Sequence, residues 1–416
     1  MNEGNAAAGV FAVRAAELDA GDPLRELRGR FVGAGDESVV SYLDGNSLGR
    51  PPLASARRIE RFVTESWGAR LIRGWDEEWF DMPLTIGDEL GGAVLGAAAG
   101  QTAVGDSTSV LLYKLVRGAL ALRPGRDEVV LDTDNFPTDR YVLEGVAAES
   151  GATLRWIAAD PRSGVCAEQV AAVVGERTAL VVLSHVAYRS GYLADAAAIT
   201  GIVHDVGALI LWDLCHSVGA VPVELDSWGV DFAVGCTYKY LNGGPGSPAF
   251  GYVRAGLLDT FVQPIWGWMG RADCFEMGPG YLPAVGIRRI LSGTPPVLGM
   301  IALRDTVAMI EEVGIAAIRE KSVALTGFAI ELVDDWLVPL GATIASPRDP
   351  RRRGSHVTVD HPEFREMTPV LWERGVIPDF RAPEGLRLGL SPLTASFAEV
   401  VRGLEVIRDE LAARVR

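Results

Sequence analysis

Five short apolar runs recur between residues 128 and 235, and helical patterns separate them. The runs are Glu128–Asp132, Thr153–Ile157, Ala179–Ser184, Leu209–Asp213 and Asp231–Gly235. Short runs that are apolar throughout are typical of strands buried on both faces of a parallel sheet. Segments 167–174 and 195–206 between them have the pattern of helices. The alternation of strand and helix predicts an α/β fold with right-handed crossovers.

The pattern changes on both sides of this region. Near the N-terminus, residues 12–31 predict a helix, and residues 41–49 predict an extended segment. After Pro295 and Pro296, segments 298–313 and 315–337 predict helices, and the remainder mixes short strands with a final helix over 396–414. We expect three parts: an N-terminal helix with an active-site segment (1–50), a large domain with a mostly parallel central sheet flanked by helices (51–300), and a small C-terminal α+β domain (301–416).

Composition excludes several classes of partner. The chain has 416 residues, 48% of them hydrophobic, and a formal net charge of −15, which argues against nucleic acid and anionic membrane surfaces. There is no apolar stretch of about 18 residues and no signal-peptide pattern at the start. Four scattered cysteines without a CxxC pair favour reduced thiols and no metal site. We therefore expect a cytoplasmic protein that binds a small molecule.

Two residues at the ends of predicted strands are candidates for chemistry. Asp213 ends one apolar run, where open α/β folds bind ligands, although an isolated carboxylate there can also be a plain loop or cap residue. Lys239 follows the next run and precedes a glycine-rich turn at 243–246. Burial would lower the pKa of such a lysine and make it a nucleophile. The alternative is a lysine whose head group reaches solvent. It is one of only three lysines, with Lys114 and Lys321.

The pair suits pyridoxal phosphate (PLP), which needs a lysine for its Schiff base and an acid beside its ring nitrogen. Residues 105–109 (Gly-Asp-Ser-Thr-Ser) open directly into a helical run, and such a terminus can bind a phosphate or be a simple cap. Phe136 could cover the ring or belong to the core. The sequence has neither a Walker A motif nor a GxGxxG after a strand, so nucleotide binding is not indicated.

Several stretches, in the same order and with similar spacing, closely resemble kynureninases. They are Tyr42–Gly49, Asp134–Tyr141, Trp212–Ala220, Trp228–Ala233 and Gly235–Gly246. The resemblance runs from about residue 40 to the end of the chain. It implies the type I fold of aspartate aminotransferase and a homodimer whose active sites are shared between subunits.

The resemblance also implies a role for individual residues. Lys239 would carry the cofactor and move a proton, with Asp213 at the ring nitrogen and Tyr238 transferring a proton near the substrate carbonyl. The cofactor would further contact Thr108, Ser109, Phe136, Asp139, Ser184, His216, Trp268 and Thr294, the last two reaching across the dimer. The substrate would contact Ser47, Trp75 and Arg387, whose guanidinium suits a carboxylate.

The implied reaction is hydrolysis of the Cβ–Cγ bond of L-kynurenine or 3-hydroxykynurenine. It yields anthranilate or 3-hydroxyanthranilate and L-alanine, a step of tryptophan catabolism and NAD biosynthesis. The chain departs from the family at Met269, Arg271 and Ala187, where Phe, His and an amide are usual.

Three alternatives stay open. One is a secondary-metabolic PLP enzyme that cleaves a substituted kynurenine, or another amino acid, by β,γ-cleavage or lyase chemistry. Another is an aminotransferase, which would share Lys239 and Asp213. The third is a PLP-binding regulator or inactive homologue, against which the presence of Arg387 argues.

Overall fold

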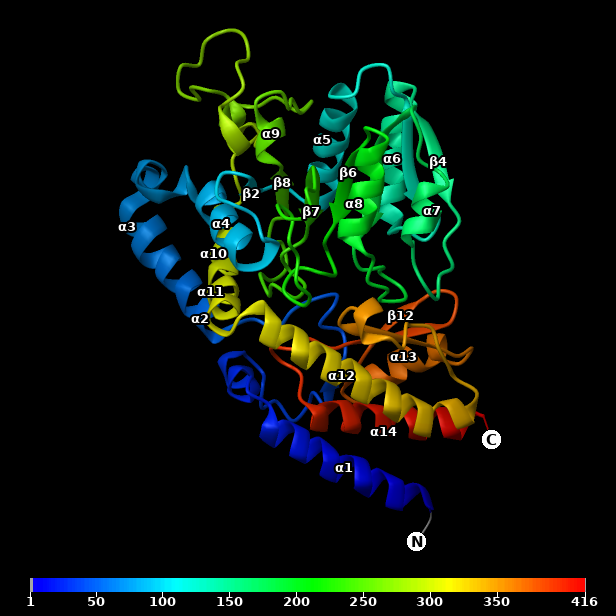
Figure 1. Ribbon diagram of the computed structural model, residues 1–416. Coiled ribbons are helices and arrows are strands. Elements are labelled where there is room, and N and C mark those ends of the chain that lie inside the picture. The colour runs from blue at the N-terminus through cyan, green and yellow to red at the C-terminus, as the bar shows by residue number, and fades with distance from the viewer. Residues whose placement is uncertain (1–2, 416) are drawn as a thin grey trace.

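The computed structural model describes residues 3–415 and has two parts: an upper part built around a large sheet and a lower part crossed by long helices (Figure 1). The large sheet has seven strands in the order β2-β8-β7-β6-β5-β3-β4. Their bounds are β2 Thr102–Val104, β3 Glu128–Asp132, β4 Thr153–Ile157, β5 Thr178–Ser184, β6 Leu209–Asp213, β7 Phe232–Gly235 and β8 Phe250–Val253.

The five predicted apolar runs are the five strands from β3 to β7, all mutually parallel. Strand β8 is antiparallel to both of its neighbours, β2 and β7. The predicted fold class is thereby confirmed. Sequence analysis missed β2 and β8, because each is only three or four residues long and β8 follows a Gly-Pro-Gly-Ser-Pro turn that has no strand pattern.

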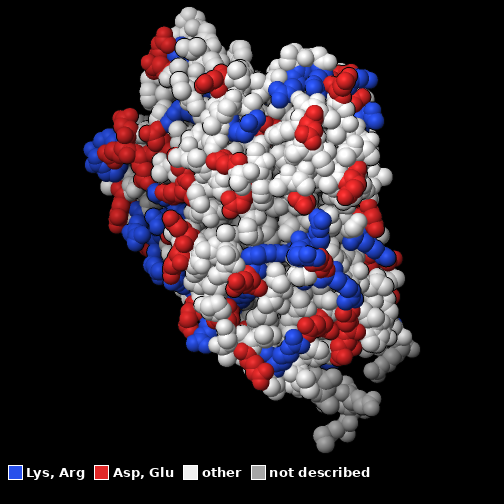
Figure 2. All heavy atoms as spheres, viewed as in Figure 1, with Lys and Arg blue, Asp and Glu red and all other residues white. Residues whose placement is uncertain are grey.

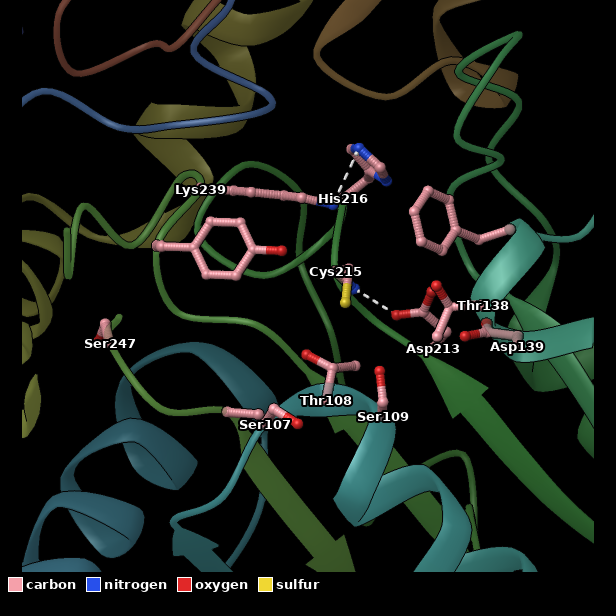
Figure 3. A pocket seen from close by; sticks show the side chains of 13 residues that line it. Ser107, Thr108, Ser109, Thr138, Asp139, Asp213, Cys215, His216, Lys239 and Ser247 are labelled. Atoms are coloured by element: carbon pink, nitrogen blue, oxygen red, sulfur yellow. Dashed lines mark hydrogen bonds between the residues drawn. The ribbon is translucent and has the colours of Figure 1, made fainter. Parts of the chain in front are cut away.

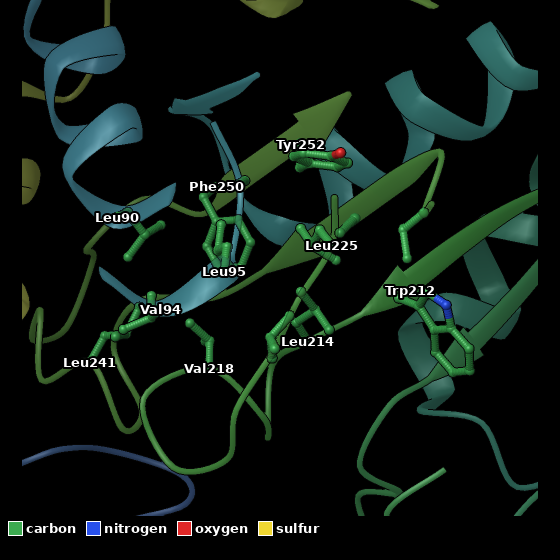
Figure 4. Packing of buried hydrophobic residues seen from close by; sticks show 14 of the residues in the cluster. Leu90, Val94, Leu95, Trp212, Leu214, Val218, Leu225, Leu241, Phe250 and Tyr252 are labelled. Atoms are coloured by element: carbon green, nitrogen blue, oxygen red, sulfur yellow. The ribbon is translucent and has the colours of Figure 1, made fainter. Parts of the chain in front are cut away.

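Alternate side chains of the strands enter different layers, as the two-residue period of a strand requires. In β3, Val129 and Leu131 pack with α5 and α6, whereas Val130 packs on the opposite face with residues of α8. Figure 4 shows this opposite layer, where Leu214 and Phe250 meet side chains such as Leu95. A sheet covered on both faces must be apolar throughout, which is the pattern in the sequence.

Strand β4 is an exception, and the prediction that it is buried was wrong. It lies at the end of the sheet and pairs only with β3. Its residues Thr153, Arg155 and Trp156 are exposed, and only Ile157 is buried. Unlike the inner strands, it has a charged residue, Arg155, in its middle, which agrees with its position at the edge.

Helices cover both faces of the sheet and extend the upper part. Helices α5 (Thr108–Ala121) and α6 (Pro137–Ser150) lie on one face, with α7 (Ala167–Ala171) and α8 (Ala196–Asp205) on the other (Figure 1). The remaining α-helices of the upper part are α2 Leu53–Arg61, α3 Gly68–Arg70, α4 Met82–Leu90, α9 Ala255–Leu258, α10 Val297–Ile301 and α11 Leu303–Val313. Short 3-10 or π turns interrupt them at η2 Phe62–Trp67, η3 Leu71–Arg73, η4 Trp75–Trp79, η5 Gly91–Leu95, η6 Trp268–Gly270 and η7 Gly286–Ile290.

The lower part contains a four-stranded antiparallel sheet, β12-β13-β10-β9, packed against helices. The strands are β9 Thr343–Ile344, β10 His356–Asp360, β12 Asp379–Arg381 and β13 Gly385–Gly389, and the helices are α12 Ile315–Trp336, α13 Phe364–Glu373 and α14 Phe397–Arg414. Two further 3-10 turns are η8 Val338–Leu340 and η9 Pro350–Arg352. The predicted strands and final helix of this region are therefore present.

The N-terminal segment joins this lower part. Helix α1 runs Glu3–Gly21 and is followed by a 3-10 turn, η1 Arg25–Arg30, rather than by a continuous helix over 12–31. Asp22 after α1 accepts the backbone N–H of Leu24 and ends the regular helix. Within the predicted extended segment only β1 (Ser41–Tyr42) is a strand, and it pairs in parallel with β11 (Val376–Ile377). Ala15 and Leu43 share the core of α12 and α14.

The predicted boundaries at residues 50 and 300 stay predictions, and residues 1, 2 and 416 of those ranges lie outside the described residues. The packing adds one detail. Met300 and Ile318 belong to the core of the upper part, whereas Leu325, seven residues after Ile318 on the same helix α12, belongs to that of the lower part. One helix thus connects both cores.

Residues 3–415 contain neither a membrane-spanning helix nor a metal-binding cluster. None of the helices there is both long and apolar enough to cross a membrane, and no cluster of three His, Cys, Asp or Glu side chains is placed to hold a metal ion. On the face seen in Figure 2, acidic and basic side chains are interspersed.

Candidate active site

A cavity of about 350 Å³ lies at the carboxyl ends of β6 and β7, within the size range of small-ligand sites. Five segments line it: the start of α5, the start of α6, the turn after β6, the loop after β7 and the turn before β8. The lining residues are Ser107, Thr108, Ser109, Phe136, Thr138, Asp139, Asp213, Cys215, His216, Tyr238, Lys239, Ser247 and Ala249. Figure 3 shows the labelled members converging on one space.

Lys239 is held by a loop that is fixed from both sides. Within the loop, the Thr237 hydroxyl donates to the carbonyl of Pro248 at 2.5 Å, and the N–H of Gly243 donates to the carbonyl of Thr237 at 2.9 Å. The N–H of Gly49 donates to the carbonyl of Tyr238 at 2.8 Å. A Cβ at Gly49 would lie 2.3 Å from the carbonyl oxygen of Lys239, so only glycine permits this approach.

The amine of Lys239 faces His216. The distance between Lys239 Nζ and His216 Nε2 is 3.2 Å, and Nζ lies 5.9 Å from the centroid of the Phe136 ring. Burial lowers the pKa of His216 far below its ordinary value, and the neighbouring positive charge of Lys239 lowers it further. The imidazole is therefore neutral, and its Nε2 can accept a hydrogen bond from the lysine amine.

Two carboxyl groups, those of Asp139 and Asp213, lie together on the wall of the cavity (Figure 3). Asp213 ends β6, and its Oδ1 accepts the N–H of Cys215 at 2.8 Å. Burial, followed by the negative charge of Asp213, raises the pKa of Asp139 well above its ordinary value. Asp139 Oδ2 is buried and has no hydrogen-bond partner among the described residues. This unpaired acceptor beside Asp213 fits a protonated nitrogen heterocycle.

The start of α5 fits a phosphate. Ser107 caps the helix by accepting the N–H of Val110 at 3.4 Å. Thr108 and Ser109 occupy the first turn, and their hydroxyls face the cavity (Figure 3). Helix N-termini bind anions through free N–H groups and the helix dipole.

An arginine site adjoins the cavity without lining it. Arg387 is 1% exposed, and it donates to the carbonyl of Tyr188 at 2.7 Å and to Ser47 Oγ at 2.9 Å. It also forms an ion pair with Asp379 of β12. Its Nε is buried and has no partner among the described residues. Tyr188 in turn packs edge-on against Phe136, with ring centroids 5.4 Å apart.

Of the predicted cofactor residues, eight line the cavity: Thr108, Ser109, Phe136, Asp139, Asp213, His216, Tyr238 and Lys239. Ser184 does not, because its hydroxyl turns to Asn135 Oδ1 at 3.0 Å. Trp268 packs instead on Trp75, with ring centroids 6.4 Å apart, and Thr294 is exposed. None of these last three residues reaches the cavity of its own chain.

The positions at which the chain departs from the kynureninase pattern also lie outside this cavity. Met269 is fully buried in the core on the α5 side of the sheet. Arg271 forms an ion pair with Glu276 and donates to the carbonyl of Asp273. Ala187 lies in the turn after β5 and lines a small separate hollow.

Sequence reasoning missed five lining residues: Ser107, Thr138, Cys215, Ser247 and Ala249. The first three lie next to predicted site residues, and their adjacency to a strand end or helix start could have indicated them. Ser247 and Ala249 belong to the turn before β8, which carries no strand signal in the sequence. Asp379, the partner of Arg387, was also missed, because nothing in the sequence shows that β12 pairs with β13.

Comparison with known proteins identifies the family. The kynureninase of Pseudomonas fluorescens is 41% identical over 401 residues, covering 95% of this chain and 94% of that protein. A kynureninase of Burkholderia pseudomallei is 40% identical over 402 residues with the same coverage. The chain belongs to the kynureninase family. The model of the kynureninase C-terminal domain additionally matches residues 318–407.

Solved structures agree on the fold. The apo cysteine desulfurase of Thermococcus onnurineus NA1 superposes with a TM-score of 0.79 at 18% identity, covering 93% of this chain and 98% of that one. A cystine C–S lyase in complex with cysteine persulfide gives 0.77 at 18% identity, covering 92% and 99%. These structures confirm the predicted fold, and the kynureninase relatives confirm the predicted family and, with it, the predicted cofactor. The kynureninase-family protein is a PLP-dependent hydrolase that acts on carbon–carbon bonds.

Proposed function

We propose that the protein hydrolyses the Cβ–Cγ bond of L-kynurenine or 3-hydroxykynurenine, releasing L-alanine and anthranilate or 3-hydroxyanthranilate. The observation that carries the proposal is the buried Arg387–Ser47 pair beside a cavity that contains Lys239 and Asp213. An amino-acid substrate has a carboxylate that a guanidinium binds well. The high identity to kynureninases over nearly the whole chain supports the same reaction.

Bound PLP supplies an electron sink for the carbanions formed next to the substrate nitrogen. Lys239 would hold the cofactor and would then carry the proton from the substrate Cα. Asp213 would keep the ring nitrogen protonated, and Asp139 would lie beside the same end of the ring. Thr108 and Ser109 would bind the phosphate, and Phe136 would cover the ring.

Tyr238 is the residue we assign to proton transfer near the substrate carbonyl. Burial, with the nearby thiols of Cys236 and Cys215, raises the pKa of Tyr238. The phenol is therefore protonated at neutral pH and acts as a hydrogen-bond and proton donor. His216, neutral and next to Lys239, positions the amine.

The proposal includes a homodimer with shared active sites in the cytoplasm. Support comes from the positions of Trp268, Thr294 and Trp75, which lie outside the cavity of their own chain. The resemblance to kynureninases implies that Trp268 and Thr294 contact the cofactor and that Trp75 contacts the substrate. In a two-fold dimer they would complete the partner's site. Four free cysteines support a reducing compartment. The reaction would serve tryptophan catabolism and NAD biosynthesis.

The test is incubation of the PLP-loaded protein with L-kynurenine and, separately, 3-hydroxykynurenine. Product fluorescence, alanine release and consumption of any added oxo acid are followed together. Equal amounts of alanine and aromatic product, without oxo-acid consumption, are expected. Conversion of neither compound by protein with bound cofactor would reject the proposed substrate class, and oxo-acid consumption would indicate an aminotransferase.

The dimer is tested by mixing two inactive variants, Lys239→Ala and Trp268→Ala. If sites are shared, random exchange yields a heterodimer with one intact site, and about one quarter of the wild-type activity should return. If sedimentation shows that subunits exchange but no activity returns, each subunit has a complete active site of its own.

A further inference from the structure

Lys114 is a buried lysine that takes no part in the chemistry assigned above. It lies in the middle of α5, and its side chain is 0% exposed. Its Nζ donates to Asp106 Oδ2 at 2.6 Å and to the carbonyl of Ile290 at 2.9 Å. Lys114 thus connects the turn at Asp106 with Ile290, two places that are far apart in the sequence.

Asp106 belongs to the turn that leads into the first turn of α5. Its φ is +49°, a left-handed conformation that side chains other than glycine adopt at a cost. Backbone bonds tie the turn to the segment before β8: Gly105 donates to the carbonyl of Ala249 at 2.9 Å, and Ala249 donates to the carbonyl of Asp106 at 3.0 Å. The bond to Lys114 fixes the Asp106 side chain as well. The next three residues, 107–109, line the cavity.

The pair also has an electrostatic consequence for an anion at this helix start. A carboxylate two residues before α5 would repel a phosphate bound at the N-terminus of that helix. Lys114 neutralises this charge from beneath the turn. Burial lowers the pKa of Lys114, while the hydrogen bond and charge of Asp106 raise it. The contact with Asp106 therefore offsets part of the effect of burial on Lys114.

The second partner of Lys114 connects the turn to another part of the proposed site. Ile290 ends η7, and two residues later the carbonyl of Ser292 accepts the N–H of Met269 at 3.2 Å. A Cβ at Gly267 would lie 2.2 Å from the same Ser292 carbonyl, so the two segments are in close contact. The segment of Gly267 and Met269 carries Trp268, and the segment of Ile290 and Ser292 leads to Thr294.

We propose that Lys114 is a positioning residue for the cofactor phosphate, because it fixes and neutralises the Asp106 turn and anchors that turn to Ile290, at the end of η7. The inference rests on the proposed use of residues 107–109 as the phosphate site. Lys114 does not contact the cofactor itself. Its effect should therefore be specific to the phosphate group and absent with a cofactor analogue that lacks it.

The experiment compares Lys114→Met with a matched control, Lys321→Met. Lys321 forms a similar buried pair, 2.7 Å from Asp22, in the lower part of the molecule. Apo proteins are titrated with PLP and with pyridoxal, and binding is followed by the visible absorbance of the lysine-bound cofactor. We expect Lys114→Met to weaken PLP binding about tenfold or more, with pyridoxal affinity changed less than about twofold. Lys321→Met should leave both affinities near those of the wild type.

A double variant separates the effect of the Asp106 charge from the effect of the lost anchor, and it also shows whether a loss of binding comes from misfolding. In the double variant Lys114→Met/Asp106→Asn no unpaired carboxylate lies near the phosphate, so PLP affinity should partly recover relative to Lys114→Met. If Lys114→Met lost affinity for PLP and pyridoxal equally, or if Lys321→Met lost as much PLP affinity, Lys114 would only stabilise the fold and the proposal would be wrong. PLP affinity unchanged in both Lys114 variants would also overturn the proposal. These readouts do not involve kynurenine, so failure of the proposed reaction would leave them interpretable.

Discussion

Arg387 Nη2 donates a hydrogen bond to Ser47 Oγ at 2.9 Å, although 340 residues separate the two in the sequence. Ser47 comes from the segment that follows β1, and Arg387 comes from the middle of β13. The N–H of Gly45 donates to the carbonyl of Gly389 at 3.1 Å and aligns these two segments. The contact connects the N-terminal segment with the C-terminal sheet at a place that adjoins the cavity.

A first prediction concerns this contact. Lysine cannot reproduce the two-pronged contact of a guanidinium, so Arg387→Lys should lower kcat/KM for L-kynurenine by about a hundredfold, mainly through KM. Ser47→Ala, which leaves the guanidinium in place, should lower it less than about tenfold. Steady-state kinetics of both variants test this order. The surface variant Arg58→Lys, whose partner Asp305 is remote from the cavity, is the control. A larger effect of Ser47→Ala than of Arg387→Lys would contradict the assignment.

A second prediction concerns the lysine. Without its amine, Lys239→Ala should lose the visible absorbance of the covalently held cofactor and lower turnover on the order of a thousandfold or more. His216→Asn should keep the absorbance and lower turnover by a smaller factor, since His216 acts on the amine from 3.2 Å. Spectra and initial rates of the two variants are compared with those of Lys321→Arg. Full activity of Lys239→Ala would exclude the residue from the chemistry.

A third prediction tests the close approach at Gly49. In Gly49→Ala the new Cβ would lie 2.3 Å from the carbonyl oxygen of Lys239 and 2.5 Å from Asn242 Nδ2. The overpacked loop must shift, which should cost about 1 to 3 kcal/mol of unfolding free energy and weaken cofactor attachment. Urea denaturation and PLP titration measure the two effects. Gly92→Ala, an exposed helical site with open space around its Cβ, should be neutral or slightly stabilising. Equal behaviour of both variants would show that the loop tolerates the shift.

A fourth prediction concerns pH and Asp132. Burial raises the pKa of Asp132 to about 7 in the folded protein, from an ordinary value of about 3.9 in an unfolded chain. Between these values the folded state holds a proton that the unfolded state has lost, so Asp132 makes stability fall as pH rises from about 4 to about 7. An asparagine can still accept the Asp134 N–H, which Asp132 Oδ1 accepts at 2.9 Å.

Asp132→Asn should therefore flatten this fall and stabilise the protein at pH 8 on the order of 1 to 4 kcal/mol. Urea denaturation at pH 5 and pH 8 provides the measurement, with the exposed Glu37→Gln as control. Burial also raises the pKa of Asp44 and Asp134 to about 6, so the variant should keep part of the slope. An unchanged difference between the two pH values would show that Asp132 is ionised in the folded state.

The sequence by itself determined the parallel strands and the meeting of Asp213 with Lys239. Doubly covered strands must be apolar throughout, and residues that follow the carboxyl ends of neighbouring parallel strands meet at one edge. The start of the helix at residues 108 and 109 could also be predicted, because a serine cap before an apolar helical run is a pattern of only a few neighbouring residues. These features depend on short segments and on rules that hold in any α/β sheet.

Only the tertiary structure decided what depends on distant segments or on position in the sheet. Strand β4 is exposed because it lies at the edge of the sheet, and the order of the strands along the chain does not give this position. Asp379 pairs with Arg387, and Lys114 with Asp106 and Ile290, through contacts that no local pattern encodes. Side-chain direction likewise turned Ser184 toward Asn135 and away from the cavity. Strand order, side-chain rotamers and long-range pairing arise from packing the whole chain, so they become visible only when the chain is folded.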